Sequence, residues 1–274
     1  MAAAAGFDFE AAIGMTVAQL QTKINAATNV TTFALAGNLT VQGGAGNDLI
    51  GLVGNVGGNT YVDLGAGDAR TGNFFGIDGD ALPAGFATVG PVTVVGGAQN
   101  DTVGINATDV RGNVLANLGS GNNVLDIADS DILLGGVSYS SGAGNDFFTL
   151  DSSTVFASVS LALGDGANDV FMSDSTIGAL NILTGSGNDE IDTANLDVLT
   201  SASVNTGSGT DGIFLHEHGN GGTNVAGALT ILTGSGVKEV EVSGDIGALS
   251  ITTGASDDSV DVYDSVSYTH LTLP

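Results

Sequence analysis

The feature of this sequence with the clearest chemistry is an acid that follows a glycine-rich turn and recurs along the chain. The stretches GGAGNDLIGL from Gly43, SGAGNDFFTL from Ser141, TGSGNDEIDT from Thr184 and TGSGTDGIFL from Thr206 all carry an Asp at the same place. Carboxylates, and the carbonyls that open glycine turns expose, are the hard oxygen ligands that divalent cations such as Ca²⁺ accept in loose geometry. The pattern therefore raises cation binding as a role for these acids.

Aligned on that acid, the copies form a column of equivalent positions. From Asp101 onward the steps are 22, 23, 23, 20, 22, 27 and 20 residues. A turn motif at near-constant spacing indicates a repeat architecture, for which we expect about ten coils. The aligned positions are Asp48, Asp101, Asn123, Asp146, Asp169, Asp189, Asp211, Lys238 and Asp258.

The residues around each acid alternate as β-strands do. A second short strand precedes each glycine turn, as in LTV at Leu39 and LNI at Leu180, and a third apolar point lies between the two. Three short strands per coil predict an all-β fold, a single-stack parallel three-sided β-solenoid (β-helix) with coils of 20–23 residues. The inward residues two places after the acid are Ile50, Val103, Leu125, Phe148, Phe171, Ile191, Ile213, Val240 and Val260.

Three segments follow from this repeat. Residues 1–28 contain helical spacing at Val17, Leu20 and Ile24 and predict a partly helical N-terminal cap. Residues 29–265 form the solenoid, with an insertion near 70–90 that projects from the stack. Residues 266–274, VSYTHLTLP, break the pattern and resemble the translation of a sequencing adapter, so we interpret them as a non-native tail of a metagenomic fragment.

The glycines of the corner have a structural role on their own. They recur four and two residues before the acid, where a corner between strands needs positive φ or close backbone approach. The Asn that often precedes the acid tolerates left-handed backbone and bonds locally. The predicted turn glycines are Gly44, Gly46, Gly144, Gly185, Gly187, Gly207 and Gly209.

The acids need a further explanation, because stacking places them beside one another. Carboxylates about 4.8 Å apart repel by roughly 0.9 kcal/mol in water and about 3.5 kcal/mol at an effective dielectric of 20. Ca²⁺ is the natural neutralising partner, although Asn123 relieves the repulsion and Lys238 supplies a covalent positive charge. The alternative is that each acid only caps its corner, and both remain open. The candidate metal ligands are Asp48, Asp101, Asp146, Asp169, Asp189, Asp211 and Asp258.

The segment GGAGNDLI at Gly43 resembles GGxGxDxU, the nonapeptide of hemolysin-type (RTX-like) calcium-binding repeats, and GGAQNDTV, SGAGNDFF, TGSGNDEI and TGSGTDGI are near matches. That resemblance implies a parallel β-roll in which aspartates and turn carbonyls bind Ca²⁺ between successive turns. By position, the implied ligands are Asp48, Asp101, Asp146, Asp189 and Asp211. The family places two motifs in each 18-residue coil, whereas this chain has one per coil. It therefore looks like a relative in corner chemistry, set in the β-strand-repeat solenoids of large bacterial surface proteins.

Composition limits the partners. The chain of 274 residues carries 30 acids against four bases, which gives a formal charge of −26. Four bases are too few to form the basic surface with which proteins bind nucleic acids or anionic membranes, so both are excluded as partners. No apolar run approaches the roughly 18 residues of a membrane span. Cysteine is absent, which fits an exported protein. We expect an extracellular or bacterial cell-surface location, with calcium, cell-surface glycans or neighbouring domains of a longer chain as partners.

Two other groupings deserve comparison. His216 and His218 would lie about 6.5–7 Å apart on one side of an extended segment. This position favours two solvated imidazoles over a Zn²⁺ or Cu²⁺ site.

Several parallel β-helices act on polysaccharides, and an outward acid pair could serve a glycan hydrolase or lyase. The expected function is a non-enzymatic structural or adhesive solenoid segment stabilised by Ca²⁺, with a carbohydrate-active β-helix or a metal-free solenoid as alternatives. The outward acids considered for catalysis are Asp126, Asp192, Glu241 and Asp261.

Overall fold

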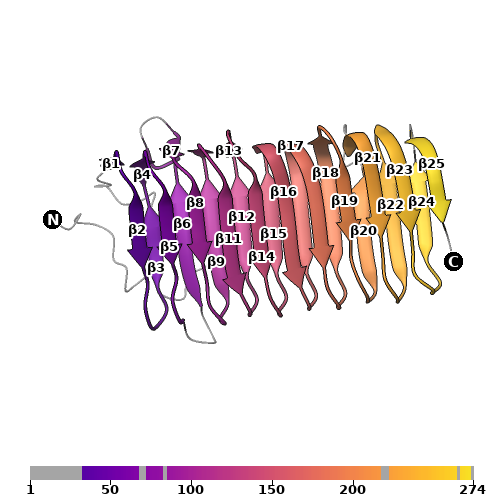
Figure 1. Ribbon diagram of the computed structural model, residues 1–274, viewed down its shortest axis with the longest axis horizontal. Coiled ribbons are helices and arrows are strands. Elements are labelled where there is room, and N and C mark those ends of the chain that lie inside the picture. The colour runs from indigo at the N-terminus through magenta and orange to yellow at the C-terminus, as the bar shows by residue number, and fades with distance from the viewer. Residues whose placement is uncertain (1–32, 68–71, 83–84, 217–221, 264–265, 273–274) are drawn as a thin grey trace.

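The computed structural model of the chain is a long stack of β-strands that runs from the N-terminal to the C-terminal end without a break in the stacking (Figure 1). The structure describes residues 33–67, 72–82, 85–216, 222–263 and 266–272. Every strand pairing is parallel and joins equivalent segments of successive coils, such as β12 with β9 and with β15. The predicted parallel β-solenoid of about ten coils is therefore confirmed.

The first of three sides follows the glycine corner, and we call it the acidic face after its outward residues. In register with one another lie Asp126, Asp192, Glu241 and Asp261, separated by residues such as Thr149 and Phe214. Its strands are β3 (Leu49–Leu52), β6 (Asn73–Asp78), β9 (Asp101–Asn106), β12 (Val124–Ala128), β15 (Phe147–Asp151), the first parts of β17 (Asp169–Thr184) and β18 (Glu190–Val198), β20 (Asp211–His216), β22 (Lys238–Ser243) and β24 (Ser259–Tyr263).

The second side is the short face, and the third we call the neutral face. The short face consists of β1 (Phe33–Leu35), β4 (Gly54–Val56), β7 (Ala87–Val89), β10 (Thr108–Val110), β13 (Asp131–Ile132) and parts of the longer strands. The neutral face consists of β2 (Leu39–Gln42), β5 (Thr60–Asp63), β8 (Val92–Val95), β11 (Val114–Gly119), β14 (Val137–Ser141), the second halves of β16 (Thr154–Gly164) and β17, β19 (Ala202–Asn205), and the ends of β21 (Asn224–Leu232), β23 (Ile246–Thr252) and β25 (Val266–Thr272).

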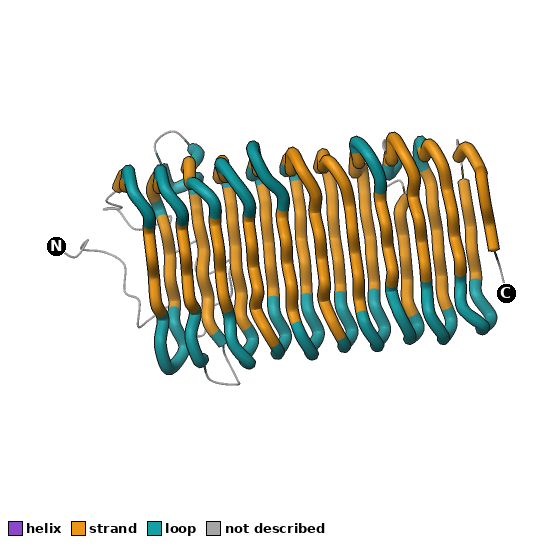
Figure 2. Tube along the Cα trace, in the orientation of Figure 1, coloured by secondary structure: helices purple, strands orange, loops and turns teal. Residues whose placement is uncertain are grey.

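The core runs along the axis of the stack. Inward residues of the three faces, such as Val103, Val110 and Val114 of one coil, are fully buried and pack on their equivalents in the next coil. Each coil therefore buries its apolar side chains only against its neighbours, as repeat proteins do. The loops of the glycine corner line up along one edge of the stack, the lower edge in Figure 2.

The corner between the acidic and short faces uses a different device. Its backbone adopts positive φ at non-glycine residues, for example Asp129 at 48° and Ser152 at 49°. In three successive coils the next residue is Ser130, Ser153 or Ser175, whose hydroxyl accepts the backbone N–H of its equivalent in the preceding coil at 3.0–3.1 Å. The Ser153 hydroxyl also donates to the carbonyl of Asp151 at 2.7 Å. Polar ladders thus tie the coils at this edge too.

The segment expected to project as an insertion is largely part of the stack. Strand β6 pairs in register with both β3 and β9, and Phe75 is fully buried. Additional described residues, 79–82 and 85–86, lie between β6 and β7. The expected helical cap at residues 1–28 lies outside the described residues. In the segment interpreted as a non-native tail, β25 pairs with β23 with two register shifts.

Candidate functional site

The side chains of the glycine corner form one continuous hydrogen-bonded column. In nearly every coil the backbone N–H of the column residue donates to the side-chain oxygen of the column residue in the next coil, at 2.8–3.3 Å. Asp211 is the exception, because Lys238 offers no acceptor and the Asp211 N–H donates to the carbonyl of Val237 instead. The members are Asp48, Asn73, Asp101, Asn123, Asp146, Asn168, Asp189, Asp211, Lys238 and Asp258.

One predicted member, Asp169, does not belong to the column. The structure places Asn168 there, and Asp169 is the exposed first residue of β17, in register with Phe147 and Glu190. The shift moves Phe171 to the outer side and leaves Val170 and Met172 in the core. The spacing of the glycines indicates the correct register, because Gly164 and Gly166 lie four and two residues before Asn168. Asn73 was hidden within the supposed insertion.

The Asn that precedes the acid forms a second ladder of opposite direction. The side-chain oxygens of Asn100, Asn122, Asn145 and Asn188 each accept a backbone N–H from the following coil, at 2.8–3.0 Å. The Asp side chain accepts from the preceding coil. The pairs Asn100-Asp101, Asn145-Asp146 and Asn188-Asp189 therefore each link their coil to both neighbours. Positive φ at this corner lies on glycines rather than on the Asn residues, contrary to the left-handed Asn that the sequence suggested.

The predicted turn glycines lie where the chain makes this corner. Gly44, Gly46, Gly144, Gly187, Gly207 and Gly209 have φ between 64° and 148°. A Cβ at Gly187 would lie 2.0 Å from the carbonyl oxygen of Gly166 in the preceding coil. At Gly185 φ is not positive, but a Cβ would still lie 2.5 Å from the Asp165 carboxylate. Backbone conformation and close stacking both require glycine at Gly144, Gly187, Gly207 and Gly209, whereas at Gly44 and Gly46, where a Cβ would meet nothing within 4 Å, conformation alone requires it.

The column limits its own charge repulsion by alternation. From Asp48 to Asp189 every second member is Asn, so neighbouring carboxylates are separated by a neutral amide. The Asn amides also act as donors. Asn168 donates through Nδ2 to Asp189 Oδ1 at 2.9 Å and to the carbonyls of Gly164 and Gly166 at 3.2 Å. The turn carbonyls thus face a side-chain donor in the Asn coils.

Lys238 provides the charge where the alternation fails. Asp189 and Asp211 are the adjacent acids of the column, and the Lys238 ammonium lies 2.5 Å from Asp211 Oδ2. Both side chains of the ion pair are completely buried. The ammonium also donates to the carbonyls of Gly209 at 2.8 Å and Gly207 at 3.3 Å. A cation thus occupies this corner, held by one carboxylate oxygen and two turn carbonyls.

At other Asp corners the second carboxylate oxygen has no partner. Oδ2 of Asp48, Asp146, Asp189 and Asp258 is buried and makes no hydrogen bond within the described part of the chain, whereas Asp101 Oδ2 accepts the Gly97 N–H at 3.0 Å. Asp146 and Asp189 are the most enclosed of the four, at 1% and 2% exposure. Burial raises the pKa of both carboxyls, against the opposing effect of the neighbouring hydroxyls of Ser141 and Thr184. A buried acceptor without a donor is costly, so these oxygens call for a proton, a water or a cation.

The residue five places before the column member differs between the two kinds of corner. It is Leu118 or Leu163 before Asn123 and Asn168, but Ser141 or Thr184 before Asp146 and Asp189. These hydroxyls donate to backbone carbonyls of the next coil, at 2.9 Å and 3.0 Å, which uses their one proton. The same hydroxyls lie beside the carboxyls of Asp146 and Asp189 and lower their pKa, but the one proton of each hydroxyl cannot serve the carbonyl and the carboxylate at once.

A shallow depression of about 280 Å³ adjoins the corner of Asp189 and Asp211 on the acidic face. Glu190 and Glu239 lie on either side of Gly212 there, in register on neighbouring strands. Further along this face, burial and the neighbouring Glu190 and Asp192 raise the pKa of Asp169. The surface next to the column is thus strongly anionic and attracts cations.

The outward acids considered for catalysis follow the sheet register. Asp126 and Asp192 are separated by Thr149 and Phe171, while Glu241 and Asp261 are direct neighbours. Burial and the charge of Asp151 raise the pKa of Asp126. Of the histidine pair, His216 ends β20, and His218 lies outside the described residues.

Comparison of the chain with protein-family models, with curated proteins and with solved structures finds no match in any of the three. Among the residues that the structure describes, no helix has the length and apolar character needed to cross a membrane.

Proposed function

We propose that this chain is a non-enzymatic structural or adhesive segment of a large exported bacterial protein. The observation that carries the proposal is the use of the motif, because three Asn-Asp pairs bind their coils to both neighbours through ladders of opposite direction. The recurring polar residues therefore hold a stack together, and the stack provides length and stiffness. Such a segment acts as a stalk or spacer that presents its faces to a glycan or to neighbouring domains.

The carbohydrate-active alternative has less support. Catalysis at a glycosidic bond needs two carboxyl groups that converge on a groove, about 5–9.5 Å apart. The outward acids instead lie in straight rows set by strand pairing, and the 380 Å³ groove of the neutral face is lined by Ser, Thr, Asn and apolar residues. Incubation with a panel of glycans, followed by a reducing-end assay, tests this alternative. Product release that depends on Glu241 or Asp261 would replace the structural role by an enzymatic one.

We further propose that Ca²⁺ binds at the corners of Asp146 and Asp189. Supporting this, Lys238 already places an ammonium against Asp211 and two glycine carbonyls, at the corner equivalent to these two. At Asp146 and Asp189 the carboxylate oxygen in that place makes no hydrogen bond within the described residues while the neighbouring hydroxyls of Ser141 and Thr184 donate to backbone carbonyls. Ca²⁺ takes six to eight oxygen ligands. No three carboxylate or imidazole groups gather within the described residues, so carbonyl and water oxygens would complete the shell.

Calorimetric titration of the metal-free chain with Ca²⁺ tests the site. We expect saturable binding that is lost when Asp146 and Asp189 are both replaced by Asn, since Asn already stands at the intervening coils and preserves the ladder. The matched control is Asp169→Asn, which removes an acid of the same surface outside the column. Binding that survives the double replacement, or that disappears equally in the control, contradicts the assignment to these two corners.

A further inference from the structure

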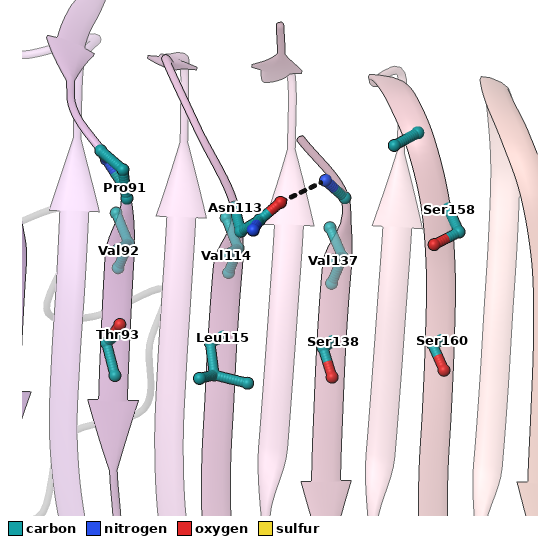
Figure 3. A pocket seen from close by; sticks show the side chains of 12 residues that line it. Pro91, Val92, Thr93, Asn113, Val114, Leu115, Val137, Ser138, Ser158 and Ser160 are labelled. Atoms are coloured by element: carbon teal, nitrogen blue, oxygen red, sulfur yellow. Dashed lines mark hydrogen bonds between the residues drawn. The ribbon is translucent and has the colours of Figure 1, made fainter. Parts of the chain in front are cut away.

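Reactive side chains are scarce in this chain, and the fold brings two of them together in its interior. The sequence has no cysteine and only four basic residues. The groove of about 380 Å³ on the neutral face is lined by hydroxyl, amide and apolar groups (Figure 3). At the glycine corner, by contrast, the amine of Lys238 contacts the carboxylate of Asp211, and both side chains are completely buried. An amine and a carboxyl group can condense to an amide, so this contact is a candidate for a covalent reaction.

The stacked coils hold the two groups in place. The Lys238 Nζ lies 2.5 Å from Asp211 Oδ2. It also donates to the carbonyls of Gly209 at 2.8 Å and Gly207 at 3.3 Å. Asp211 Oδ1 accepts the backbone N–H of Asp189 at 3.1 Å. Well-oriented intramolecular reactions reach effective concentrations of about 10⁵–10⁸ M, so contact of this kind favours reaction between groups that rarely condense in water.

We propose that Lys238 and Asp211 condense to an amide bond that links two successive coils covalently. A proton first passes from Nζ to Oδ2 along their contact, which leaves a neutral amine and a carboxylic acid. The Nζ lone pair then attacks Cγ, and the negative charge that develops on Oδ1 is stabilised by the Asp189 N–H. A second Nζ proton passes to the Oδ2 hydroxyl, the Cγ–Oδ2 bond breaks and water leaves. The ammonium and the carboxylate thus become an amide and one water molecule, without an oxidant or any other reactant.

The buried corner favours both the reaction and its product. Burial disfavours the charged forms of an amine and a carboxyl group, so the neutral pair needed for the attack costs less here than in water. Exclusion of water also slows the reverse hydrolysis. In the product, the amide N–H keeps the Gly209 carbonyl as its acceptor, and the amide oxygen keeps the Asp189 N–H as its donor. Both polar atoms of the new bond therefore retain a partner.

The bond gives the stack a covalent tie that hydrogen bonds do not provide. It joins residues 27 positions apart, on the neighbouring strands β20 and β22. A tie of this kind suits the structural segment proposed for this chain, because it holds the two coils together under force. Neither reacting side chain belongs to the corners of Asp146 and Asp189, so the reaction does not depend on Ca²⁺.

Intact mass and tryptic digestion of the denatured full chain test the bond. The expected mass is one water molecule below that of the sequence. Trypsin cleaves after Lys and Arg but not after a lysine whose amine is acylated, so the linked chain yields residues 112–274 as one peptide. An unlinked chain yields residues 112–238 and 239–274. The full mass of the sequence together with complete cleavage after Lys238, even after prolonged incubation of the folded chain, overturns the proposal.

A matched variant excludes the other source of water loss. Asp211 precedes Gly212, and an Asp-Gly pair can lose water by closing a cyclic imide on its own backbone. Lys238→Arg keeps a positive charge at the corner but removes the primary amine, so its mass should equal that of its sequence. Water loss that persists in Lys238→Arg contradicts the amide. The digest of the parent chain decides the question even where the variant does not fold, because a cyclic imide leaves Lys238 open to trypsin.

Discussion

Replacing Lys238 by Met would remove the one column side chain that carries a positive charge. The ammonium and the Asp211 carboxylate are both fully buried, and the change leaves that carboxylate without its counter-charge. Breaking a buried ion pair by removal of one partner costs about 3–5 kcal/mol. The carbonyls of Gly207 and Gly209 lose a donor as well. We expect the thermal midpoint in EGTA to fall by roughly 6–15 °C.

The double variant Asp211→Asn, Lys238→Met separates the charge effect from lost packing. An Asn at 211 matches Asn168, whose Nδ2 donates to the carbonyls of Gly164 and Gly166, so it should restore the missing donor. Circular dichroism melts of the parent, both single variants and the double variant form a thermodynamic cycle. We expect the double variant to recover at least half of the loss. A loss below about 1 kcal/mol for Lys238→Met alone, or a double variant as unstable as that single one, would refute the reasoning.

Three more predictions concern the same edge. Replacing both Asp146 and Asp189 by Asn should raise the free energy of unfolding of the metal-free chain by about 1–3 kcal/mol in total, and its thermal midpoint with it, because two orphaned acceptors are replaced by amide donors that reach the turn carbonyls. An unchanged or lower midpoint in EGTA contradicts this. Burial raises the pKa of Asp126, Asp146, Asp169 and Asp189, so these carboxyls bind protons more tightly in the folded chain than in the unfolded one. The free energy of unfolding of the metal-free chain should therefore increase as pH falls from 7 toward about 5. Urea midpoints that decrease over this range count against it. Gly187→Ala should lower the free energy of unfolding by several kcal/mol, since φ at Gly187 is 145° and the new Cβ would lie 2.0 Å from a carbonyl oxygen. Gly104→Ala should be near neutral, because no atom lies within 4 Å of a Cβ there. Equal thermal midpoints for the two variants would show that the corner is not the tight contact described.

The fold could be predicted because two periodicities agreed. The glycine spacing marked one corner in each coil, and period-two alternation marked the strands, so the parallel stack followed before any contact was known. The prediction that Asp169 belongs to the column was wrong because it followed the Asn-Asp dipeptide rather than the spacing of the glycines. In that coil the pair is displaced by one residue, and backbone stacking, which the glycines report, decides the register.

The hydrogen bonding of the corner was less accessible from sequence. Asn and Asp are both good turn residues, and nothing in their spacing shows that their side chains accept from opposite neighbours. The burial of Lys238 was also invisible, since a lone lysine is usually exposed. The change from Leu118 and Leu163 to Ser141 and Thr184 before the acid was a usable signal. It distinguishes the neutral corners of Asn123 and Asn168 from those of Asp146 and Asp189.

Thermal unfolding in Ca²⁺ and in EGTA, measured side by side for the parent chain and the Asp146→Asn, Asp189→Asn variant, tests the central claim most directly. A cation that binds only the folded corners stabilises the parent by mass action, so its midpoint should be several degrees higher in millimolar Ca²⁺, while the variant should melt at one temperature in both buffers. A parent chain with the same midpoint in Ca²⁺ and in EGTA would contradict the claim and reduce the Asp column to a hydrogen-bonded cap of the solenoid.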